Sequence, residues 1–334
     1  MYKKTYIEPT VKTAKGLDIV TDNYYSFRVK KKPEITGPVI KGVDVGLTRF
    51  ADLNLDYQTT DLCTTEVEYE DYDIGGYRVR WFHPLSVVEN APVIFYIHGG
   101  GYITGTIERY VNVDKRLAEL INGIVVHVDY TLSPETGYPT AIEQSYHAIE
   151  YMLYYHDRFL IDPEKVAIMG DSAGGNCCAA LPFRDRKNNY IKLNILYYPA
   201  VDMTDYSPKK FDMSYFGKGL DPMVEARVRS LVDTSDMNRA YLQNGEDPHD
   251  EMISPLLAKN FEGYPRTLVI CAEYDFLTMQ SEEFCDRLNA AGIQVDFYKF
   301  IGTFHGFLDR VGYMESSDRS MKIVAQIMRE HFNY

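Results

Sequence analysis

The sequence predicts an α/β fold, with a mostly parallel central sheet and helices on both of its faces. Apolar runs of strand length alternate with helical stretches over most of the chain between residues 93 and 332. Such alternation implies right-handed crossovers and therefore a parallel sheet. The 334 residues are 45% hydrophobic and 25% charged, which is typical of a globular protein with a large core. This length fits one large domain with an insertion, or two smaller domains.

The elements are expected to begin with an antiparallel hairpin, since residues 64–84 alternate at period two around Gly75-Gly76. The strands expected after it are residues 93–97, 124–128, 166–169, 193–198, 266–272 and 295–300. The helices expected between and after them are residues 111–121 and 140–155, a helix that follows Ser172 and includes 176–180 and Pro182, and residues 280–291 and 317–332. Pro182 should kink or end the third of these helices, because its ring would clash with the carbonyl of Cys178.

Two stretches interrupt this alternation. The first 61 residues are irregular and rich in tyrosine and phenylalanine, which suggests short helices lying on another domain. Residues 201–254 lack strand spacing, although Met223 to Val232 has a helical pattern, and an insertion of this length is typical of a lid or cap. The alternative is a surface excursion without a function. The predicted parts are an N-terminal segment contributing to the cap (1–61), a core (62–200 and 255–334) and a cap insertion (201–254).

Charge and cysteine content narrow the classes of function. Acidic residues outnumber basic ones, 48 against 35, so phosphate backbones and anionic membrane surfaces are disfavoured partners. The five cysteines have no framework spacing, and three or four of them lie in apolar surroundings typical of small buried hydrophobic residues, which fits a reducing compartment. The N-terminal stretch lacks the apolar core of a secretory signal, and no run of about 18 apolar residues occurs. We therefore expect a cytoplasmic protein with no metal, no cofactor, no nucleic-acid partner and no stable membrane association; assembly as a homodimer stays open.

The stretch GDSAGG, residues 170–175, carries the first chemical signal. An apolar strand precedes it and small helix-forming residues follow it, which is the context that gives a Gly-x-Ser-x-Gly turn its meaning. The turn is so tight that it leaves no room for a β-carbon at Gly170 or Gly174, and it holds Ser172 in a strained, exposed position. We predict that Ser172 is a nucleophile; the alternative is an ordinary serine in a flexible turn.

A serine hydroxyl needs a base within hydrogen-bond reach. The histidines after Ser172 are His249, His305 and His331. His305 comes directly after a predicted strand, and the carboxyl ends of such strands are where these sheets place catalytic groups. His249 lies among acids in the insertion and His331 lies in the last helix, so His305 is the predicted base.

A carboxylate must orient that base, and Glu273 and Asp275 both follow the strand that ends at Ala272. Asp275 is favoured, because Phe276 and Leu277 beside it would exclude water. The alternative for either acid is to cap the next helix.

The second independent signal is His98-Gly99-Gly100-Gly101-Tyr102, directly after the strand 93–97. Consecutive glycines let backbone N–H groups converge on one point, as a developing oxyanion requires. In this form of loop the remaining donor comes from the residue after the nucleophile, here Ala173. A phosphate-binding loop is the alternative, but neither Gly-Lys-Ser/Thr nor G-x-G-x-x-G is present. His98 and Gly99 are expected to support the loop.

Six motifs occur in a defined order along the chain. They are HGGGY (98–102), DYTLSPE (129–135), GDSAGGN (170–176), YYPAVD (197–202), AEYDFL (272–277) and FHGF (304–307). In these motifs, over roughly residues 65–334, the chain resembles the hormone-sensitive-lipase-like family of α/β-hydrolases, bacterial carboxylesterases in particular. The resemblance implies an α/β-hydrolase fold with a mainly helical cap formed by the N-terminal segment and the insertion. It also implies a triad of Ser172, Asp275 and His305, and an oxyanion hole formed by the N–H groups of Gly100, Gly101 and Ala173.

The sequence departs from the family pattern near the pocket, with Thr131, Ser133 and Phe276 where the family usually has Arg, Ala and Pro.

The leading hypothesis is a serine carboxylesterase that hydrolyses short-chain or aryl esters through an acyl-enzyme. An amidase, such as an arylformamidase, would use the same residues. A non-catalytic small-molecule binding protein on the same fold is the third hypothesis. The gibberellin receptors of plants resemble the family but lack the histidine, so His305 argues against this last hypothesis.

Overall fold

The computed structural model describes residues 2–18, 39–40, 43–44, 59–87, 89–204, 212–233 and 238–334. Within them, nine strands form one sheet in the order β1-β11-β10-β9-β8-β6-β7-β5-β4. The strands are β1 (Lys4–Ile7), β4 (Val67–Asp73), β5 (Arg78–Pro84), β6 (Ala91–Ile97), β7 (Ile124–Asp129), β8 (Ile161–Asp171), β9 (Leu193–Tyr197), β10 (Arg266–Tyr274) and β11 (Val295–Phe304). All neighbouring pairs are parallel except those that involve β5, which is antiparallel to both β4 and β7. The predicted fold class and the predicted hairpin are thus confirmed.

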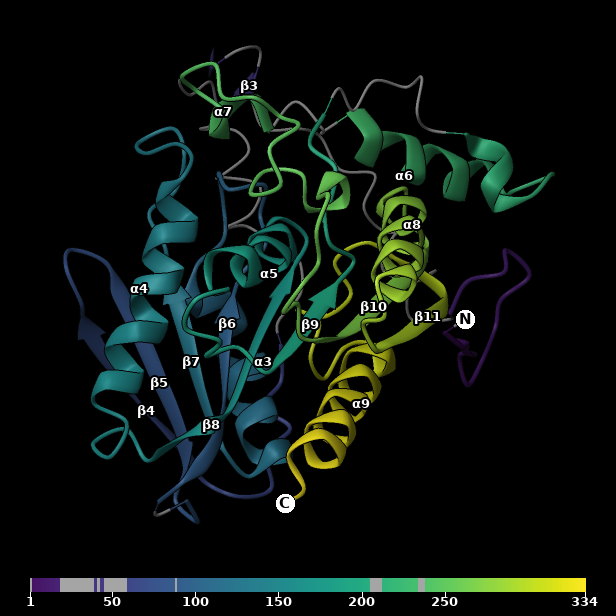
Figure 1. The fold of residues 1–334 in the computed structure, drawn as a ribbon. Coiled ribbons are helices and arrows are strands. Elements are labelled where there is room, and N and C mark those ends of the chain that lie inside the picture. The colour runs from purple at the N-terminus through teal and green to yellow at the C-terminus, as the bar shows by residue number, and fades with distance from the viewer. Residues whose placement is uncertain are drawn as a thin grey trace.

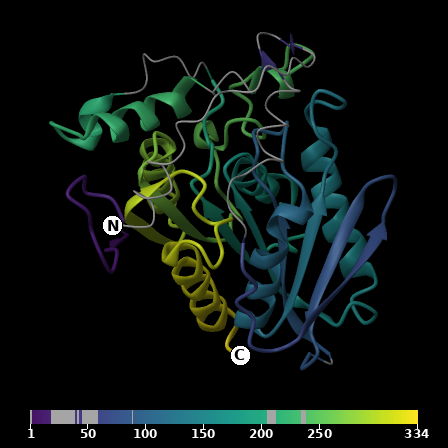
Figure 2. The same ribbon diagram turned by 180° about the vertical axis from the view of Figure 1, so that it is seen from behind.

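Helices cover both faces of the sheet. They are α3 (Ile107–Ile121), α4 (Thr140–Tyr154), α5 (Ala173–Arg184), α8 (Leu277–Ala290) and α9 (Glu315–Phe332). The helices α4, α5 and α8 pack over one face in a large hydrophobic cluster and lie toward the viewer in Figure 1. The helices α3 and α9 contact each other and share the cluster on the other face, which is turned forward in Figure 2. Burial on both faces explains why β6 has no exposed residue.

The strand before the nucleophile turn starts earlier than predicted. The strand was predicted over residues 166–169, but β8 already begins at Ile161. The pairing with β6 is irregular there, because Ala91 pairs with Ile161 while Val93 pairs with Val166. The extra residues bulge out of the ladder around Pro163, which has no N–H to donate.

The N-terminal residues correct one detail of the domain prediction. Residues 4–7, which fall in the segment assigned to the cap, instead form the edge strand β1, parallel to β11. The ammonium of Lys4 binds the carboxylate of Glu282 in α8 at 2.8 Å, which holds this strand against the core. A strand of four residues carries too weak a pattern to be recognised from sequence. Residues 19–38, 41–42 and 45–58 lie outside the described part of the chain, and the contribution of this segment to a cap stays a prediction.

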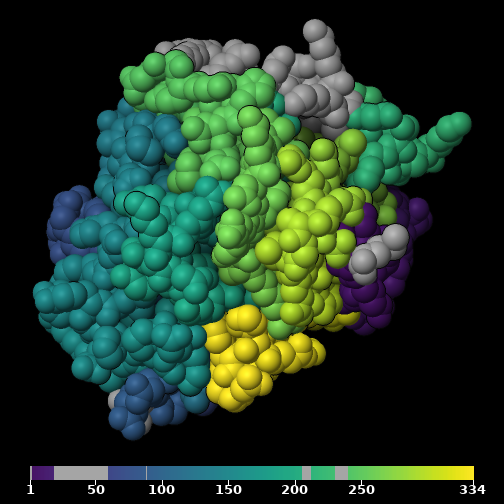
Figure 3. All heavy atoms as spheres, viewed as in Figure 1, coloured from purple at the N-terminus to yellow at the C-terminus, as the bar shows by residue number. Residues whose placement is uncertain are grey.

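The predicted insertion contains the short helix η1 (Met213–Phe216) and the helices α6 (Pro222–Asp233) and α7 (Asn238–Tyr241). Far earlier in the chain, before the core, β2 (Val39–Ile40) and β3 (Val43–Asp44) form a hairpin with two residues in each strand. The helix α6 confirms the helical pattern predicted for Met223 to Val232. Both α6 and α7 lie beyond one end of the sheet, at the top of Figure 1. The chain then returns through η3 (Pro255–Leu257), which contacts α5 and α8, and the green segment in Figure 3 fills the surface between them.

The helix α5 continues to Arg184, two residues past Pro182. A proline at this position cannot donate to the carbonyl of Cys178, one turn earlier. The side-chain amide of Asn194, in β9, donates to that carbonyl at 3.1 Å instead. Because Cys178 and Asn194 are both buried, this bond replaces the one that proline removes, and the helix is not forced to end.

We expect Asn194→Leu to lower the free energy of unfolding by about 1–3 kcal/mol, since the carbonyl of Cys178 would be left buried without a donor. Urea unfolding followed by circular dichroism measures this change. The matched control is Asn244→Leu, at an exposed position, for which we expect a change within about 0.5 kcal/mol. Equal stabilities of the two variants would contradict the role given to Asn194.

Candidate active site

The turn between β8 and α5 has the strained geometry predicted for it. Ser172 has φ 55° and ψ −116°, a conformation that L-residues rarely adopt. A β-carbon on Gly170 would lie 2.4 Å from the carbonyl oxygen of Gly174, and one on Gly174 would lie 2.0 Å from that of Ile97. Both contacts are far too short, so only glycine fits at these two positions. The serine is presented at the carboxyl end of the sheet.

The structure brings Ser172, His305 and Asp275 into one chain of hydrogen bonds. The Nε2 atom of His305 lies 2.9 Å from the Oγ atom of Ser172. The Nδ1 atom of the same ring lies 2.6 Å from the Oδ2 atom of Asp275, whose side chain is fully buried. A carboxylate can only accept, so Nδ1 carries the proton, and Nε2 is left as the acceptor for the serine hydroxyl.

Strand register explains why these side chains meet. Tyr274 at the end of β10 pairs with Phe304 at the end of β11. The next residue on each strand is therefore Asp275 and His305, side by side at the same edge of the sheet. The third strand, β8, supplies Ser172 at the same edge.

Asp275 makes the contacts of both roles considered for the acids, which are to orient the base and to cap the next helix. Its second oxygen accepts the N–H of Leu277 at the start of α8, as a capping residue does, while Oδ2 faces His305. Glu273 has a different partner, because its carboxylate accepts the N–H of Gly302 at 2.8 Å. His249 is exposed and contacts Asp247, away from this group.

One residue at the site was missed by the sequence reasoning. Tyr198 follows β9, whose last residue pairs with Asp171, so its backbone lies beside Ser172. Its buried ring lies 4.6 Å from the ring of His305, and its hydroxyl accepts the N–H of Leu308 at 3.2 Å. Tyr198 therefore supports both the histidine and the loop that follows it. The motif at 197–202 contained the signal, since its second residue, Tyr198, directly follows β9.

The glycine loop lies against the nucleophile turn. Gly100 and Gly101 have φ values of 120° and 62°, which favour glycine. The carbonyl of Gly99 lies 2.8 Å from the Nδ1 atom of His98, and that of Gly100 accepts the N–H groups of Ile103 and Thr104. These bonds fix the orientation of the peptide planes that carry the N–H groups of Gly100 and Gly101.

Asp171, the residue before the serine, connects the turn to this loop. Its Oδ1 atom accepts the N–H of Gly99 at 2.8 Å and the hydroxyl of Tyr96 at 2.7 Å. Its Oδ2 atom accepts the hydroxyl of Tyr110 at 3.1 Å. A β-carbon on Gly99 would lie 2.6 Å from this carboxylate, which explains the need for glycine there. The backbone positions of the loop and of the turn are thus tied together.

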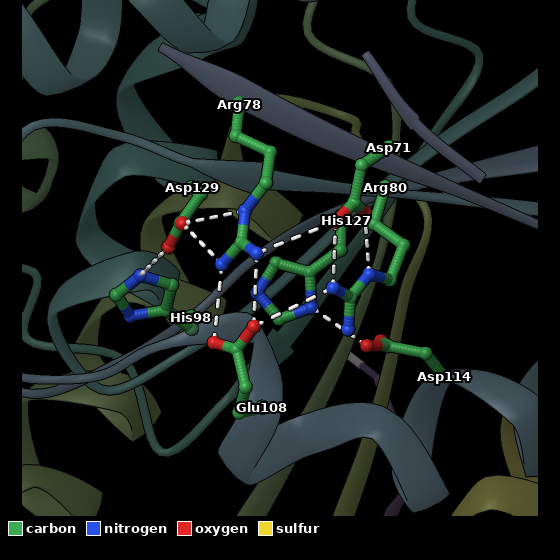
Figure 4. Close-up of polar contacts among 8 residues, drawn as sticks. All are labelled: Asp71, Arg78, Arg80, His98, Glu108, Asp114, His127 and Asp129. Carbon is green, nitrogen blue, oxygen red and sulfur yellow. Dashed lines mark hydrogen bonds and ion pairs between the residues drawn. The ribbon is translucent and has the colours of Figure 1, made fainter. Parts of the chain in front are cut away.

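His98, at the start of the glycine loop, lies next to a network of charged side chains that is only partly buried (Figure 4). Arg78 binds Asp129 at 2.8 Å and Glu108 at 2.9 Å, and the Nε2 atom of His98 lies 3.9 Å from the Oδ1 atom of Asp129. Burial lowers the pKa of His98 to about 4, with a further contribution from the neighbouring His127. The imidazole of His98 is therefore neutral near pH 7. The carbonyl of Gly99 can only accept a hydrogen bond, so the proton of the His98 ring is on Nδ1.

The second part of this network is the pair of His127 and Asp114, whose facing atoms are 2.7 Å apart. Neither side chain is exposed. Burial lowers the pKa of His127 to about 3 and raises that of Asp114 well above its usual value, so both shifts favour an uncharged pair. Arg80, beside this pair in Figure 4, binds Asp71 instead.

The lowered pKa of His98 predicts an acid-sensitive fold. The folded state excludes a proton that the unfolded chain binds below about pH 6.5, so stability falls as the pH drops from about 6.5 to about 4. Over this window His98 should account for a loss of about 3 kcal/mol. His98→Asn keeps a donor toward Gly99 and cannot titrate. Between pH 6.5 and pH 4 we therefore expect its free energy of unfolding to fall by about 3 kcal/mol less than that of the wild type.

Urea unfolding at a series of pH values measures the difference. The control is His249→Asn, at an exposed position, which should keep the acid dependence of the wild type. Parallel curves for the wild type and His98→Asn would show that His98 does not contribute.

Comparison with known proteins identifies the family to which this fold belongs. A family model described as the alpha/beta hydrolase fold matches residues 94–309, more than half of the chain. The chain belongs to the α/β-hydrolase family. The α/β-hydrolase core also accounts for the order of the motifs, with the serine, acid and histidine following β8, β10 and β11.

Individual α/β-hydrolases of similar sequence are esterases by name. The arylesterase of Saccharolobus solfataricus is 28% identical over 80% of this chain and 82% of its own length. The carboxylesterase NlhH of Mycobacterium tuberculosis is 28% identical over 82% of this chain and 85% of its own. The solved structure of an esterase from Pyrobaculum calidifontis is 30% identical, covers 79% of this chain and 85% of its own, and superimposes with a TM-score of 0.69.

The described residues hold no group of three or more His, Cys, Asp or Glu side chains placed to bind a metal ion. They also contain no helix with the length and apolar character needed to cross a membrane.

Proposed function

We propose that this α/β-hydrolase is a serine carboxylesterase that acts on short-chain or aryl carboxylic esters. The observation that carries the proposal is the hydrogen-bond chain from Ser172 through His305 to the buried Asp275, at 2.9 and 2.6 Å. The three groups have the order and contacts that nucleophilic acyl transfer requires. Relatives named arylesterase and carboxylesterase support the choice of ester substrates.

In the first half of the reaction the Oγ atom of Ser172 attacks the ester carbonyl carbon, and its proton passes to Nε2 of His305. The carbonyl becomes a tetrahedral oxyanion. When this intermediate collapses, the bond to the alcohol oxygen breaks and the leaving alcohol takes the proton from His305. An acyl group is then bound to Ser172. Asp275 stays ionised, holds the ring in the required tautomer and stabilises the imidazolium that forms transiently.

In the second half water replaces the alcohol. His305 accepts a proton from the water as the water oxygen attacks the acyl carbon, and it returns this proton to Oγ of Ser172 when the acyl bond breaks. The carboxylic acid leaves and the resting state is restored.

Three backbone N–H groups are assigned to the oxyanion, those of Gly100, Gly101 and Ala173. Ala173 is the first residue of α5, so its N–H points out of the helix start, where partial positive charge also accumulates. The carbonyl of the Ser172–Ala173 peptide accepts the N–H of Asn176 at 2.9 Å, which fixes that peptide plane. Each such donor contributes about 10²-fold or more to the rate. His98 and Gly99 support the loop.

The direct test is covalent labelling with a fluorophosphonate, followed by mass spectrometry of the modified peptide. We expect one adduct, on Ser172, and hydrolysis of p-nitrophenyl acetate and butyrate by the unlabelled protein. If the fluorophosphonate does not react with the protein and the untreated protein hydrolyses no ester, the proposal is overturned and a binding protein is favoured. Faster hydrolysis of anilides and formamides than of the matched esters would replace esterase by amidase.

A further inference from the structure

Asn176, four residues after Ser172 in α5, uses its whole side-chain amide to join three separate segments. Its Oδ1 atom accepts the hydroxyl of Tyr102, in the glycine loop, at 2.5 Å. Its Nδ2 atom donates to the carbonyls of Ala200 at 2.6 Å and of Ile253 at 2.9 Å. The side chain is fully buried, so each of these contacts is made in the absence of competing water.

The backbone of Asn176 acts on the same region. Its N–H donates to the carbonyl of Ser172 at 2.9 Å, and the N–H of Ala200 approaches the same oxygen at 3.2 Å. This carbonyl belongs to the peptide that carries the N–H of Ala173. Ala200, which Asn176 binds through Nδ2, therefore helps to orient one of the proposed oxyanion donors.

The hydrogen bond between the Tyr102 hydroxyl and Asn176 links the amide to the glycine loop. Tyr102 follows Gly101 directly, and its φ of 62° is unusual for a residue with a side chain. Its ring is buried and stacks on Tyr241, with centroids 3.7 Å apart and planes 8° from parallel. Its carbonyl accepts the N–H of Ser133 at 2.7 Å. A strained backbone persists only where its surroundings hold it, and the hydroxyl bond to Asn176 is one of these restraints.

We propose that Asn176 is a positioning residue that sets the distance between the two halves of the oxyanion hole. One half is the loop of Gly100 and Gly101, and the other is the N–H of Ala173. The same amide ties both halves to the segment around Ile253, which leads out of the predicted cap insertion. The proposal rests on the proposed esterase function and adds a residue that does not touch the reacting atoms.

An isosteric change isolates this role. Asn176→Asp keeps the size of the side chain and an acceptor for Tyr102, but it presents a carboxylate oxygen to the carbonyls of Ala200 and Ile253, which can donate nothing. Tyr102→Phe removes only the hydroxyl and leaves the bonds to both carbonyls in place. The control is Asn188→Asp, at an exposed position beyond the end of α5.

The experiment compares kcat and KM for a p-nitrophenyl ester and for the matching thionoester, whose sulfur fits an oxyanion hole poorly. We expect kcat for the ester to fall by about 10²-fold in Asn176→Asp and about tenfold in Tyr102→Phe, with KM within about threefold of the wild type. The preference for the ester over the thionoester should shrink in both variants. Asn188→Asp should match the wild type.

A loss of folding alone would lower kcat equally for the ester and the thionoester, and it would leave the preference for the ester unchanged. Folded variants with the wild-type kcat and preference would overturn the proposal, and if Asn176→Asp fails to fold, Tyr102→Phe decides by the same criterion. The function itself is judged separately, by fluorophosphonate labelling of Ser172 in the wild type. Labelled wild type with unchanged variants removes only this inference, whereas wild type that is neither labelled nor active removes the esterase proposal and this inference with it.

Discussion

Replacing Ser172 by alanine should lower kcat for p-nitrophenyl butyrate by about 10⁴-fold or more. The hydroxyl is the group that forms the acyl-enzyme in the proposed reaction, and the described structure offers His305 no other hydroxyl at 2.9 Å from Nε2. The substitution removes one oxygen and leaves the backbone unchanged, so we expect the thermal midpoint to stay within a few degrees of the wild type. Steady-state kinetics and a thermal melt measure both quantities.

The control is Ser86→Ala, at an exposed position after β5, which should keep the wild-type kcat. Any hydrolysis that remains in Ser172→Ala should not respond to fluorophosphonate treatment. A Ser172→Ala protein that hydrolyses the ester at the wild-type rate would remove the nucleophile from the mechanism and leave the family fold without a serine reaction.

Most of the sheet could be predicted from sequence, because strands buried on both faces are written as continuous apolar runs. Residues 93–97 and 124–128 are of this kind, and they became the cores of β6 and β7. The elements that were missed or misplaced lack this signature. The edge strand β1 is only partly buried, and the start of β8 contains Asp and Pro, residues that normally indicate a turn.

The candidate site was predictable for a different reason, which is that each of its residues directly follows a strand. Ser172 and His305 could be selected from that position, together with the need of a hydroxyl for a base. The choice between Glu273 and Asp275 could not be settled in that way. It depends on which carboxylate points toward the histidine, and in the structure Glu273 points to the N–H of Gly302.

Residues that act through others left the weakest trace in the sequence. Tyr198 and Asn176 occur inside motifs, but nothing in the order of letters states that one lies against His305 and the other bonds to Tyr102. Such roles depend on register between strands and on the path of loops far apart in the chain. The same is true of Asn194, whose amide replaces the hydrogen bond that Pro182 cannot make.

Asp275→Asn should lower kcat by about 10⁴-fold, although the two side chains have the same shape. The carboxylate accepts the proton of Nδ1, whereas an amide can turn its NH₂ group toward His305 and donate. The ring then carries its proton on Nε2, the atom that must accept the proton of Ser172. The substitution would therefore favour the tautomer that cannot act as a base.

The matched control is Glu273→Gln, two residues before Asp275 and within β10. Its carboxylate bonds to the backbone of Gly302 and not to the histidine, so we expect kcat within about tenfold of the wild type and a small loss of stability. Fluorophosphonate labelling should slow in Asp275→Asn and stay fast in Glu273→Gln, because labelling also needs an activated hydroxyl. The reverse order would assign the orienting carboxylate to Glu273, and the 2.6 Å contact of Asp275 with His305 would then serve the fold alone.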